Sequence, residues 1–246
     1  MQFSSDKETS VCNLASLVLP SFVDEDRNFE LKSLHATTKV LVRNLNRVID
    51  TTLYPTASAA TNNLKHRPLG VGVQGLSDTF TSLMFPFDSP EAHRLNEDIS
   101  QTIYHAALEA STEIAEERRG HYQSFEDSPT ARGLLQFDLW NVRVNDDLFD
   151  WSSLRERIKR NGLANSLLIA YMPTAGTTQI TGFSEACEPI MRYNFTSWVE
   201  SQADPNTGHS QQFVFKEGFI RRISSHLQKA RPSTRRLWFM EYGNSR

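Results

Sequence analysis

The sequence feature that most constrains the fold is a short apolar run, SLLIA at residues 166–170, between two helix-forming stretches. A continuous apolar run of this length is typical of a strand buried on both faces. The amphipathic residues 151–160 predict a helix that ends at Gly162, and a second helix is expected to start near Thr177. Residues 67–75 predict another strand, in which three glycines indicate close approach of a neighbouring backbone. Helix, buried strand, loop and helix in this order predict an α/β fold.

Two longer amphipathic stretches predict that the fold is rich in helix. Residues 31–50 and 90–117 repeat apolar side chains at intervals of three and four, which is the period of one helix face. Asp88 or Ser89 is expected to cap the second of these helices, with Pro90 in its first turn. The predicted stripes are Leu34, Thr38, Leu41, Leu45 and Val48 in the first helix, and Leu95, Ile99, Ile103, Ala106, Ala110 and Ile114 in the second.

Charge and hydropathy exclude several classes of protein. A net charge of −3 gives no overall electrostatic attraction to nucleic acid or to anionic membranes. The longest apolar run, residues 167–172, is too short to span a bilayer, so no membrane association is expected. The first ten residues, MQFSSDKETS, lack the basic and apolar regions of a signal peptide. The sequence therefore predicts a cytoplasmic protein with no nucleic-acid partner.

Cysteine and histidine usage predicts neither disulfides nor a metal. Cys12 and Cys187 are the only cysteines, too few for a disulfide framework, and a reducing compartment is expected. Cys187 is interpreted as a structural residue. The seven histidines show neither HxxxH nor Cys/His ligand spacing, so no zinc site is expected.

The loop after the predicted strand, YMPTAGTTQITGF at residues 171–183, has the composition of an anion site. A helix that starts directly after a buried strand presents free N–H groups at its first turn, where the helix dipole also favours negative charge. Gly176 allows close backbone approach, and the threonines add hydroxyl donors. The alternative interpretation is a threonine-rich helix cap without a ligand, and the pattern alone leaves both open.

Four sequence blocks carry a family resemblance: SVCNLASLVLP (10–20), HRPLGVGVQGLSD (66–78), SPTARGLLQFDLWN (128–141) and WSSLRERIKRNGLANSLLIAYMPTAGTTQI (151–180). In this order they resemble the large, catalytic subunit of class I ribonucleotide reductase, most closely its eukaryotic form, over residues 8–190. The signature residues of the last block are Trp151, Leu154, Gly162, Asn165, Ala170 and Pro173.

The resemblance implies a fold and an activity. Residues 1–192 would form the C-terminal half of a ten-stranded α/β barrel, and residues 193–246 a divergent, basic tail. The family reduces ribonucleoside diphosphates to 2′-deoxyribonucleoside diphosphates, which supplies deoxyribonucleotides for DNA replication. The alternatives are a non-catalytic remnant that binds nucleotide or associates with intact subunits, and a truncated or mis-spliced product without a role.

The resemblance also assigns site residues. Thr174, Ala175, Gly176 and Thr177 would cradle the substrate diphosphate, with Gly176 where the family commonly has serine. Cys12 matches a redox-active cysteine that forms a disulfide with a second thiol expected upstream. The family's radical cysteine, in an Asn-Leu-Cys-x-Glu finger loop before VCNLASL, has no counterpart in these residues, so this chain alone is predicted to be inactive.

The family's cofactors and partners are implied in the same way. No cofactor is expected on this chain, because the radical and di-metal centre belong to the small subunit, and ATP and dNTP effectors bind regions missing here. The implied partners are the ribonucleoside diphosphate, the radical-bearing small subunit, a second large subunit and a thioredoxin-type reductant.

Overall fold

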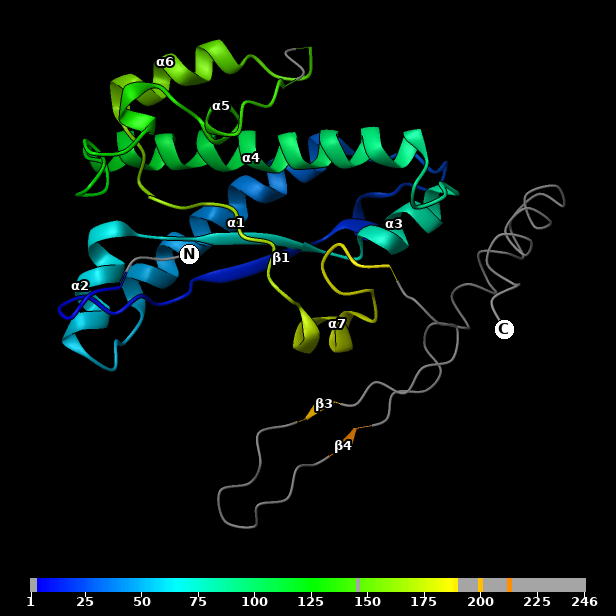
Figure 1. The fold of residues 1–246 in the computed structure, drawn as a ribbon, viewed down its shortest axis with the longest axis horizontal. Coiled ribbons are helices and arrows are strands. Elements are labelled where there is room, and N and C mark those ends of the chain that lie inside the picture. The colour runs from blue at the N-terminus through cyan, green and yellow to red at the C-terminus, as the bar shows by residue number, and fades with distance from the viewer. Residues whose placement is uncertain (1–3, 145–146, 190–198, 201–211, 214–246) are drawn as a thin grey trace, which may run out of the picture.

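The computed structural model describes residues 4–144, 147–189, 199–200 and 212–213 of the chain. In these residues, helices pack over one face of a small parallel sheet (Figure 1). Helix α1 (Leu31–Thr51) contacts both the sheet and the long helix α4 (Pro90–Arg118), and α6 (Trp151–Asn161) packs on α4. The short helix α7 (Ala175–Thr181) lies on the other side of the sheet in Figure 1. This arrangement confirms the predicted helix-rich α/β fold.

The sheet has two parallel strands, β1 (Leu14–Val18) and β2 (Gly70–Gln74). In their register Leu14 lies opposite Gly70, and Val18 lies opposite Gln74. Strand β2 confirms the strand predicted within residues 67–75. The described residues contain no ten-stranded barrel, but one further antiparallel pair, β3 (Val199–Glu200) with β4 (Gln212–Phe213).

The apolar run at residues 166–170 lies along the other edge of β2. The amide N–H groups of Leu69 and Val71 donate to the carbonyl oxygens of Leu167 and Leu168, both at 2.8 Å. The Ala170 N–H donates back to the Val71 carbonyl at 3.1 Å. The run is therefore paired in parallel with β2, although only Ile169 forms a bridge in the regular strand pattern. Strand β2 thus occupies the centre of the three parallel segments.

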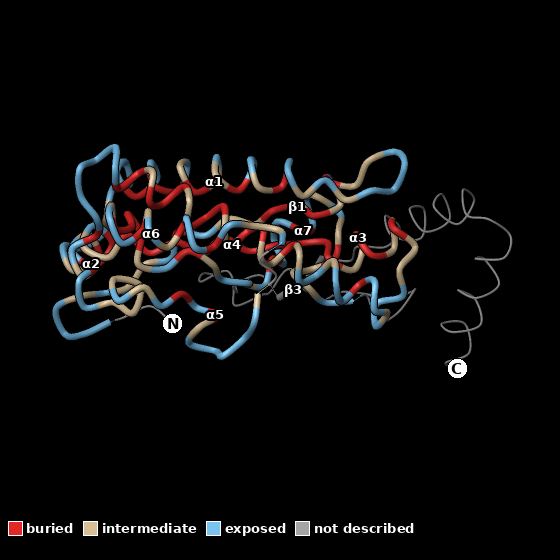
Figure 2. Tube along the Cα trace, turned by 90° about the horizontal axis from the view of Figure 1, so that it is seen from above, coloured by how far each residue is buried: buried red, intermediate tan, exposed pale blue. Residues whose placement is uncertain are grey.

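Helices α1 and α4 begin and end close to the predicted positions. The Ser89 hydroxyl caps α4 by accepting a hydrogen bond from the Ala92 N–H at 3.2 Å, and Pro90 lies in the first turn as predicted. The predicted stripe of α1 needs one correction, because Val48 is 46% exposed while Val42 and Ile49 are fully buried. Helix α1 contacts the sheet as well as α4, so its buried face is broader than one straight line of side chains. Figure 2 shows buried residues along one edge of α1 and exposed residues along the other.

Six shorter elements complete the described part of the chain. The helix α2 (Ala57–His66) lacks the apolar period that predicts the longer helices, since it buries Asn62 and Asn63. Gly75 joins β2 to α3 (Leu76–Leu83) in a left-handed conformation with φ of +78°. None of the helices among the described residues combines the length and the apolar character needed to cross a membrane. The shorter elements are η1 (Leu19–Phe22), α2 (Ala57–His66), α3 (Leu76–Leu83), η2 (Thr130–Arg132), α5 (Gln136–Leu139) and α7, introduced above.

The glycines of β2 permit the close approach that the sequence predicts. A Cβ atom on Gly72 would lie 2.7 Å from the Ala170 carbonyl oxygen and 2.8 Å from the Met172 sulfur. A Cβ atom on Gly70 would lie 2.5 Å from a methyl carbon of Leu14. Larger residues would therefore push the chain after residue 170 away from the sheet.

A buried amide network joins the helices to the strands. The side chains of Asn46 and Asn165 form two reciprocal hydrogen bonds, at 3.0 and 3.1 Å. The Asn165 amide also donates to the Arg67 carbonyl at 2.8 Å, and its oxygen accepts from the Ser111 hydroxyl at 3.0 Å. The network therefore ties the residue just before the apolar run to α1, to α4 and to the C-cap residue of α2.

Candidate functional site

The threonine-rich loop lies where the paired run at residues 167–170 leaves the sheet. Thr174 is the N-cap of α7, which begins at Ala175. The helix therefore starts two residues before the predicted position near Thr177. The early start places three consecutive residues, Ala175, Gly176 and Thr177, in the first turn.

Buried threonine contacts hold the loop in place. The Thr174 hydroxyl accepts a hydrogen bond from the Ala186 N–H at 3.0 Å, and the Thr174 carbonyl accepts the Thr178 N–H at 2.9 Å. The Thr177 hydroxyl donates to the side-chain oxygen of Gln74, at the end of β2, at 3.2 Å. Two of the threonines thus support the loop, while Thr177 ties its exposed first turn to the sheet.

The first turn of α7 presents unused backbone donors. The N–H groups of Ala175, Gly176 and Thr177 have no hydrogen-bond acceptor among the described residues, and all three residues are exposed. No heavy atom lies within 4 Å of the position that a Cβ of Gly176 would occupy. The turn therefore has the free donors and the open space that an anionic ligand needs.

Cys12 is an exposed, free thiol just before β1. The next residue is buried and anchored, because the Asn13 side chain donates to the Asn63 side chain at 2.6 Å and to the Pro68 carbonyl at 2.8 Å. Side chains alternate along a strand, so Cys12 continues the row of Leu14 and is expected on the α7 side of the sheet. No hydrogen bond joins Cys12 to the loop in the described part of the chain.

Cys12 and the loop are linked only indirectly, through the side chains of β1 that point to the same face of the sheet as Leu14. The same row includes Ser16, whose hydroxyl lies 3.2 Å from the Met172 sulfur just before the loop. Val18 belongs to the same row and lies opposite Gln74 on β2, and the Gln74 side chain contacts Thr177. The predicted thiol and the predicted anion loop are thus assigned to one face of the sheet.

Cys187 differs from Cys12 in its surroundings. It is half-buried, free of a disulfide, and packs against the hydrophobic core. Burial raises the pKa of its thiol, and the nearby Glu188 carboxylate raises the pKa further, so this thiol stays protonated at neutral pH. These surroundings fit the structural role predicted for Cys187.

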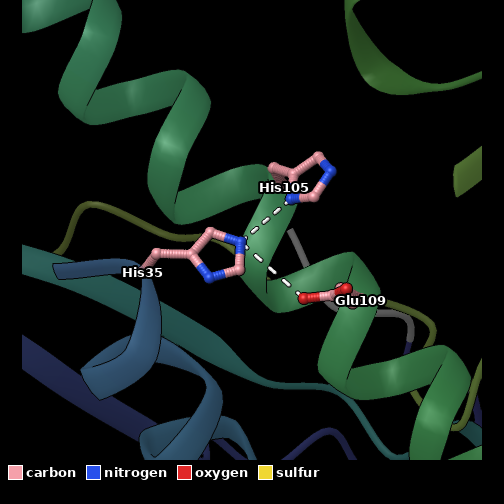
Figure 3. Close-up of side chains that lie close together, drawn as sticks. All are labelled: His35, His105 and Glu109. Carbon is pink, nitrogen blue, oxygen red and sulfur yellow. Dashed lines mark hydrogen bonds and ion pairs between the residues drawn. The ribbon is translucent and has the colours of Figure 1, made fainter. Parts of the chain in front are cut away.

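A second polar cluster, which the histidine spacing does not reveal, lies between α1 and α4. The Nε2 atom of His35 lies 3.0 Å from Nδ1 of His105 and 3.8 Å from Oε2 of Glu109, as Figure 3 shows. Lys39 bridges Glu109 and Glu113 at 2.8 and 2.7 Å. The available sequence signal was the spacing of four between His105 and Glu109, which places both on one face of α4.

Burial controls the protonation of this cluster. It lowers the pKa of His105 to about 4, with the His35 side chain contributing in the same direction. Burial also lowers the pKa of His35, so both imidazoles are neutral at pH 7. For Glu109, burial alone would raise the pKa, but the hydrogen bond and charge of Lys39 lower the pKa overall. Arg157, whose guanidinium lies 3.2 Å from Glu109, adds a second cation at the edge of the cluster.

Comparison with known proteins gives a consistent result. Residues 1–214 match the family described as "Ribonucleotide reductase, barrel domain". The chain is 51% identical over 189 residues to the ribonucleoside-diphosphate reductase large chain of Schizosaccharomyces pombe, covering 77% of this chain and 23% of that protein. It is 50% identical over 195 residues to large chain 2 of Saccharomyces cerevisiae, and 48% identical over 189 residues to the large subunit of Danio rerio.

These relatives are much longer than the sequence. The matched region covers 77% of this chain in both further cases, but 22% of the Saccharomyces cerevisiae protein and 24% of the Danio rerio protein. The chain thus spans about a quarter of the length of these relatives. The tail predicted at residues 193–246 lies outside the described residues, apart from β3 and β4, and the boundary at residue 192 stays a prediction.

Proposed function

The chain belongs to the ribonucleotide reductase barrel-domain family, and from this premise we propose that it forms part of the active site of a ribonucleoside-diphosphate reductase large subunit. The single observation that carries the proposal is the first turn of α7, where three exposed residues have N–H groups without acceptors among the described residues. Residues 1–192 would supply part of a ten-stranded barrel, with residues 193–246 as a divergent tail.

The proposed substrate site is a cradle for the diphosphate. The N–H groups of Ala175, Gly176 and Thr177 would donate to phosphate oxygens, and Thr174 would hold the turn through its buried hydroxyl. Helix α7 has only seven residues, so the direct N–H contacts would contribute more than the dipole of the whole helix. Gly176 lacks the hydroxyl that a serine would add, which favours weak binding.

The proposed catalytic residue is Cys12. Removal of the 2′-hydroxyl replaces a C–O bond by a C–H bond and releases water, and the two electrons come from two thiols that become a disulfide. Cys12 would be one of these thiols. Cys187 does not fit as the second, because it is half-buried against the core and its thiol pKa is raised. The second thiol and the hydrogen-abstracting radical would then come from other parts of the enzyme.

The proposed partners are the proteins that would supply the radical and the reductant that this chain lacks in the proposal. A small radical-bearing subunit, a second large subunit and a thioredoxin-type reductant would complete the reaction, with ATP and dNTP effectors acting on other regions, in the cytoplasm. By themselves, residues 1–246 should not form deoxyribonucleoside diphosphates from ribonucleoside diphosphates. A complementing large-subunit segment that carries the radical cysteine should restore turnover, and a Cys12→Ser variant should not respond.

Calorimetry tests the diphosphate cradle directly. Pyrophosphate, ADP and CDP should bind weakly and with similar affinity, because the base has no proposed contact on this chain. The Thr177→Pro variant removes one N–H donor and the contact with Gln74, and it should reduce binding of all three ligands about tenfold. The matched control is Gln179→Ala, an exposed position later in the same helix. Base-selective binding, or binding that survives Thr177→Pro with an intact circular dichroism spectrum, would contradict the cradle.

A second candidate function is a non-catalytic remnant that binds nucleotide or associates with intact subunits. The open edge of β1 favours it, because this edge has no strand partner among the described residues and can pair with another chain. The complementation assay separates the candidates. A remnant would bind diphosphates or an intact subunit and still give no Cys12-dependent turnover.

A further inference from the structure

We propose that His35, His105 and Glu109 form a binding site for a divalent transition-metal ion of the Zn²⁺ class between α1 and α4. One ligand atom of each residue lies within 4.8 Å of the other two. Figure 3 shows the imidazole of His35, from α1, directed toward His105 and Glu109, which lie one turn apart on α4. This inference is independent of the proposed reductase function.

The spacing of the three atoms fits one coordination sphere. Ligands bound to zinc at about 2.0–2.1 Å in a tetrahedron lie roughly 3.3 Å from one another. The observed separations from His35 Nε2 are 3.0 Å to His105 Nδ1 and 3.8 Å to Glu109 Oε2. Small side-chain rotations would therefore bring all three atoms to bonding distance, with no change in the backbone of either helix.

The donor set favours transition metals over magnesium or calcium. Two imidazole nitrogens and one carboxylate suit zinc and its neighbours, whereas magnesium and calcium prefer oxygen ligands. Binding requires imidazoles that are not protonated, and burial keeps both His35 and His105 neutral at pH 7. The ion would replace the hydrogen bond that now joins the two rings. Three protein ligands leave a fourth position for water.

The surroundings both cover the site and limit its affinity. The ring of Phe149 stacks on His105, with centroids 4.3 Å apart, and on His35, with centroids 5.5 Å apart. Lys39 competes directly for Glu109, since its ammonium lies 2.8 Å from the proposed ligand oxygen. Lys39 can release Glu109 and keep its 2.7 Å contact with Glu113, so the ion displaces one ion pair without leaving Lys39 unpaired.

The consequence would be a cross-link between two segments that are far apart in the sequence. His35 and His105 are separated by 70 residues and belong to the two helices that cover the sheet. An ion that binds the folded state alone raises the free energy of unfolding according to its concentration relative to Kd. The site would thus stabilise the contact between α1 and α4.

The test is a zinc titration of the 246-residue chain after treatment with a chelator. A Cys12→Ser background removes an exposed thiol that could bind zinc by itself. Calorimetry should give one ion per chain, and Co²⁺ should give the visible absorption of a four-coordinate site. His35→Gln and His105→Gln should each weaken zinc binding at least tenfold.

Two further variants make the test specific. Lys39→Met should tighten zinc binding severalfold, because it removes the competing ammonium, and an adventitious surface site would not respond in this way. His93→Gln is the matched control, since His93 is an exposed histidine on the same helix α4, and it should leave the affinity unchanged. If His105→Gln does not fold, the zinc affinity of His35→Gln, on the other helix, and the Co²⁺ spectrum of the parent chain test the site. Absence of binding, or equal affinity in the histidine variants and the parent, would overturn the site.

Discussion

The two sides of the sheet use their polar groups in opposite ways. On the helix side, the buried side chains of Asn46 and Asn165 bond to each other and to their surroundings. On the α7 side, the exposed residues Ala175, Gly176 and Thr177 have N–H groups without protein acceptors among the described residues, and the exposed thiol of Cys12 is expected on the same side. Buried polar groups that are hydrogen-bonded within the protein stabilise the fold, whereas exposed polar groups without protein partners are available to water or to a ligand. Changes on the helix side should therefore alter stability, and changes on the α7 side should alter binding.

The largest expected effect is the loss of Asn165. Asn165→Ala would remove both reciprocal bonds to Asn46, the acceptor of the Ser111 hydroxyl proton and the side-chain donor to the buried Arg67 carbonyl. The free energy of unfolding should fall by about 3–4 kcal/mol, because each lost hydrogen bond contributes about 0.5–1.5 kcal/mol and the Arg67 carbonyl left unsatisfied costs about 1–3 kcal/mol more. Urea denaturation measures the change.

The matched control for Asn165 is another asparagine nearby. The Asn161 side chain makes one hydrogen bond, to Glu116 at the surface, so Asn161→Ala should cost less than about 1 kcal/mol. Equal losses in the two variants would break the proposed contrast between buried and exposed polar groups.

The second largest expected effect is a loss of stability in acid, caused by the histidines between α1 and α4. The folded-state pKa values of His35 and His105 lie below the unfolded value of 6.5, with His105 at about 4. The unfolded chain therefore binds more protons between these pH values. The stabilisation is complete above pH 6.5 and is lost as the pH falls toward 4, by up to about 1.4 kcal/mol per pH unit for each proton.

Urea denaturation at several pH values without metal tests the acid effect. His105→Gln should flatten the slope of unfolding free energy against pH between pH 6.5 and 4.5, while the exposed His93→Gln should leave the slope unchanged. An unaltered slope in His105→Gln would mean that this imidazole is charged in the folded protein.

The smallest expected effect on stability lies on the α7 side. Gly176→Ser places a side chain where no heavy atom lies within 4 Å, in a helical position that disfavours glycine. The free energy of unfolding should change by no more than about 0.5 kcal/mol. Pyrophosphate should nevertheless bind severalfold more tightly, because the new hydroxyl adds a donor beside the free N–H groups. A loss of stability above 1 kcal/mol would show that the two sides are less separate than described.

Periodic patterns explain which elements the sequence predicts well. Helices α1, α4 and α6 carry apolar stripes, and β2 is a short run bounded by glycine and proline. Helix α2 has no such stripe, since it buries Ala59, Asn62 and Asn63. The polar groups of such a helix are satisfied by tertiary contacts, which no local period reveals.

The candidate sites also show that sequence patterns predict local features but not contacts between distant segments. The donors of the α7 turn follow from a strand, a loop and a helix in sequence, so residues 173–178 predict them. The α1–α4 cluster depends on helices that bring His35 and His105 together across 70 residues. Only the spacing of His105 and Glu109 is local, and two side chains on one helix face are too common to indicate a site.

The reciprocal pairing of Asn46 with Asn165 also sets an order of events during synthesis. The two residues are 119 positions apart, and a ribosome adding about 5–20 residues per second needs on the order of ten seconds to make the interval. Until then the central strand β2 has only β1 beside it, and the amide of Asn46 has no partner from the missing run. Nascent chains halted before residue 165 should therefore be cut readily by proteases, and those extended well past residue 170 should resist.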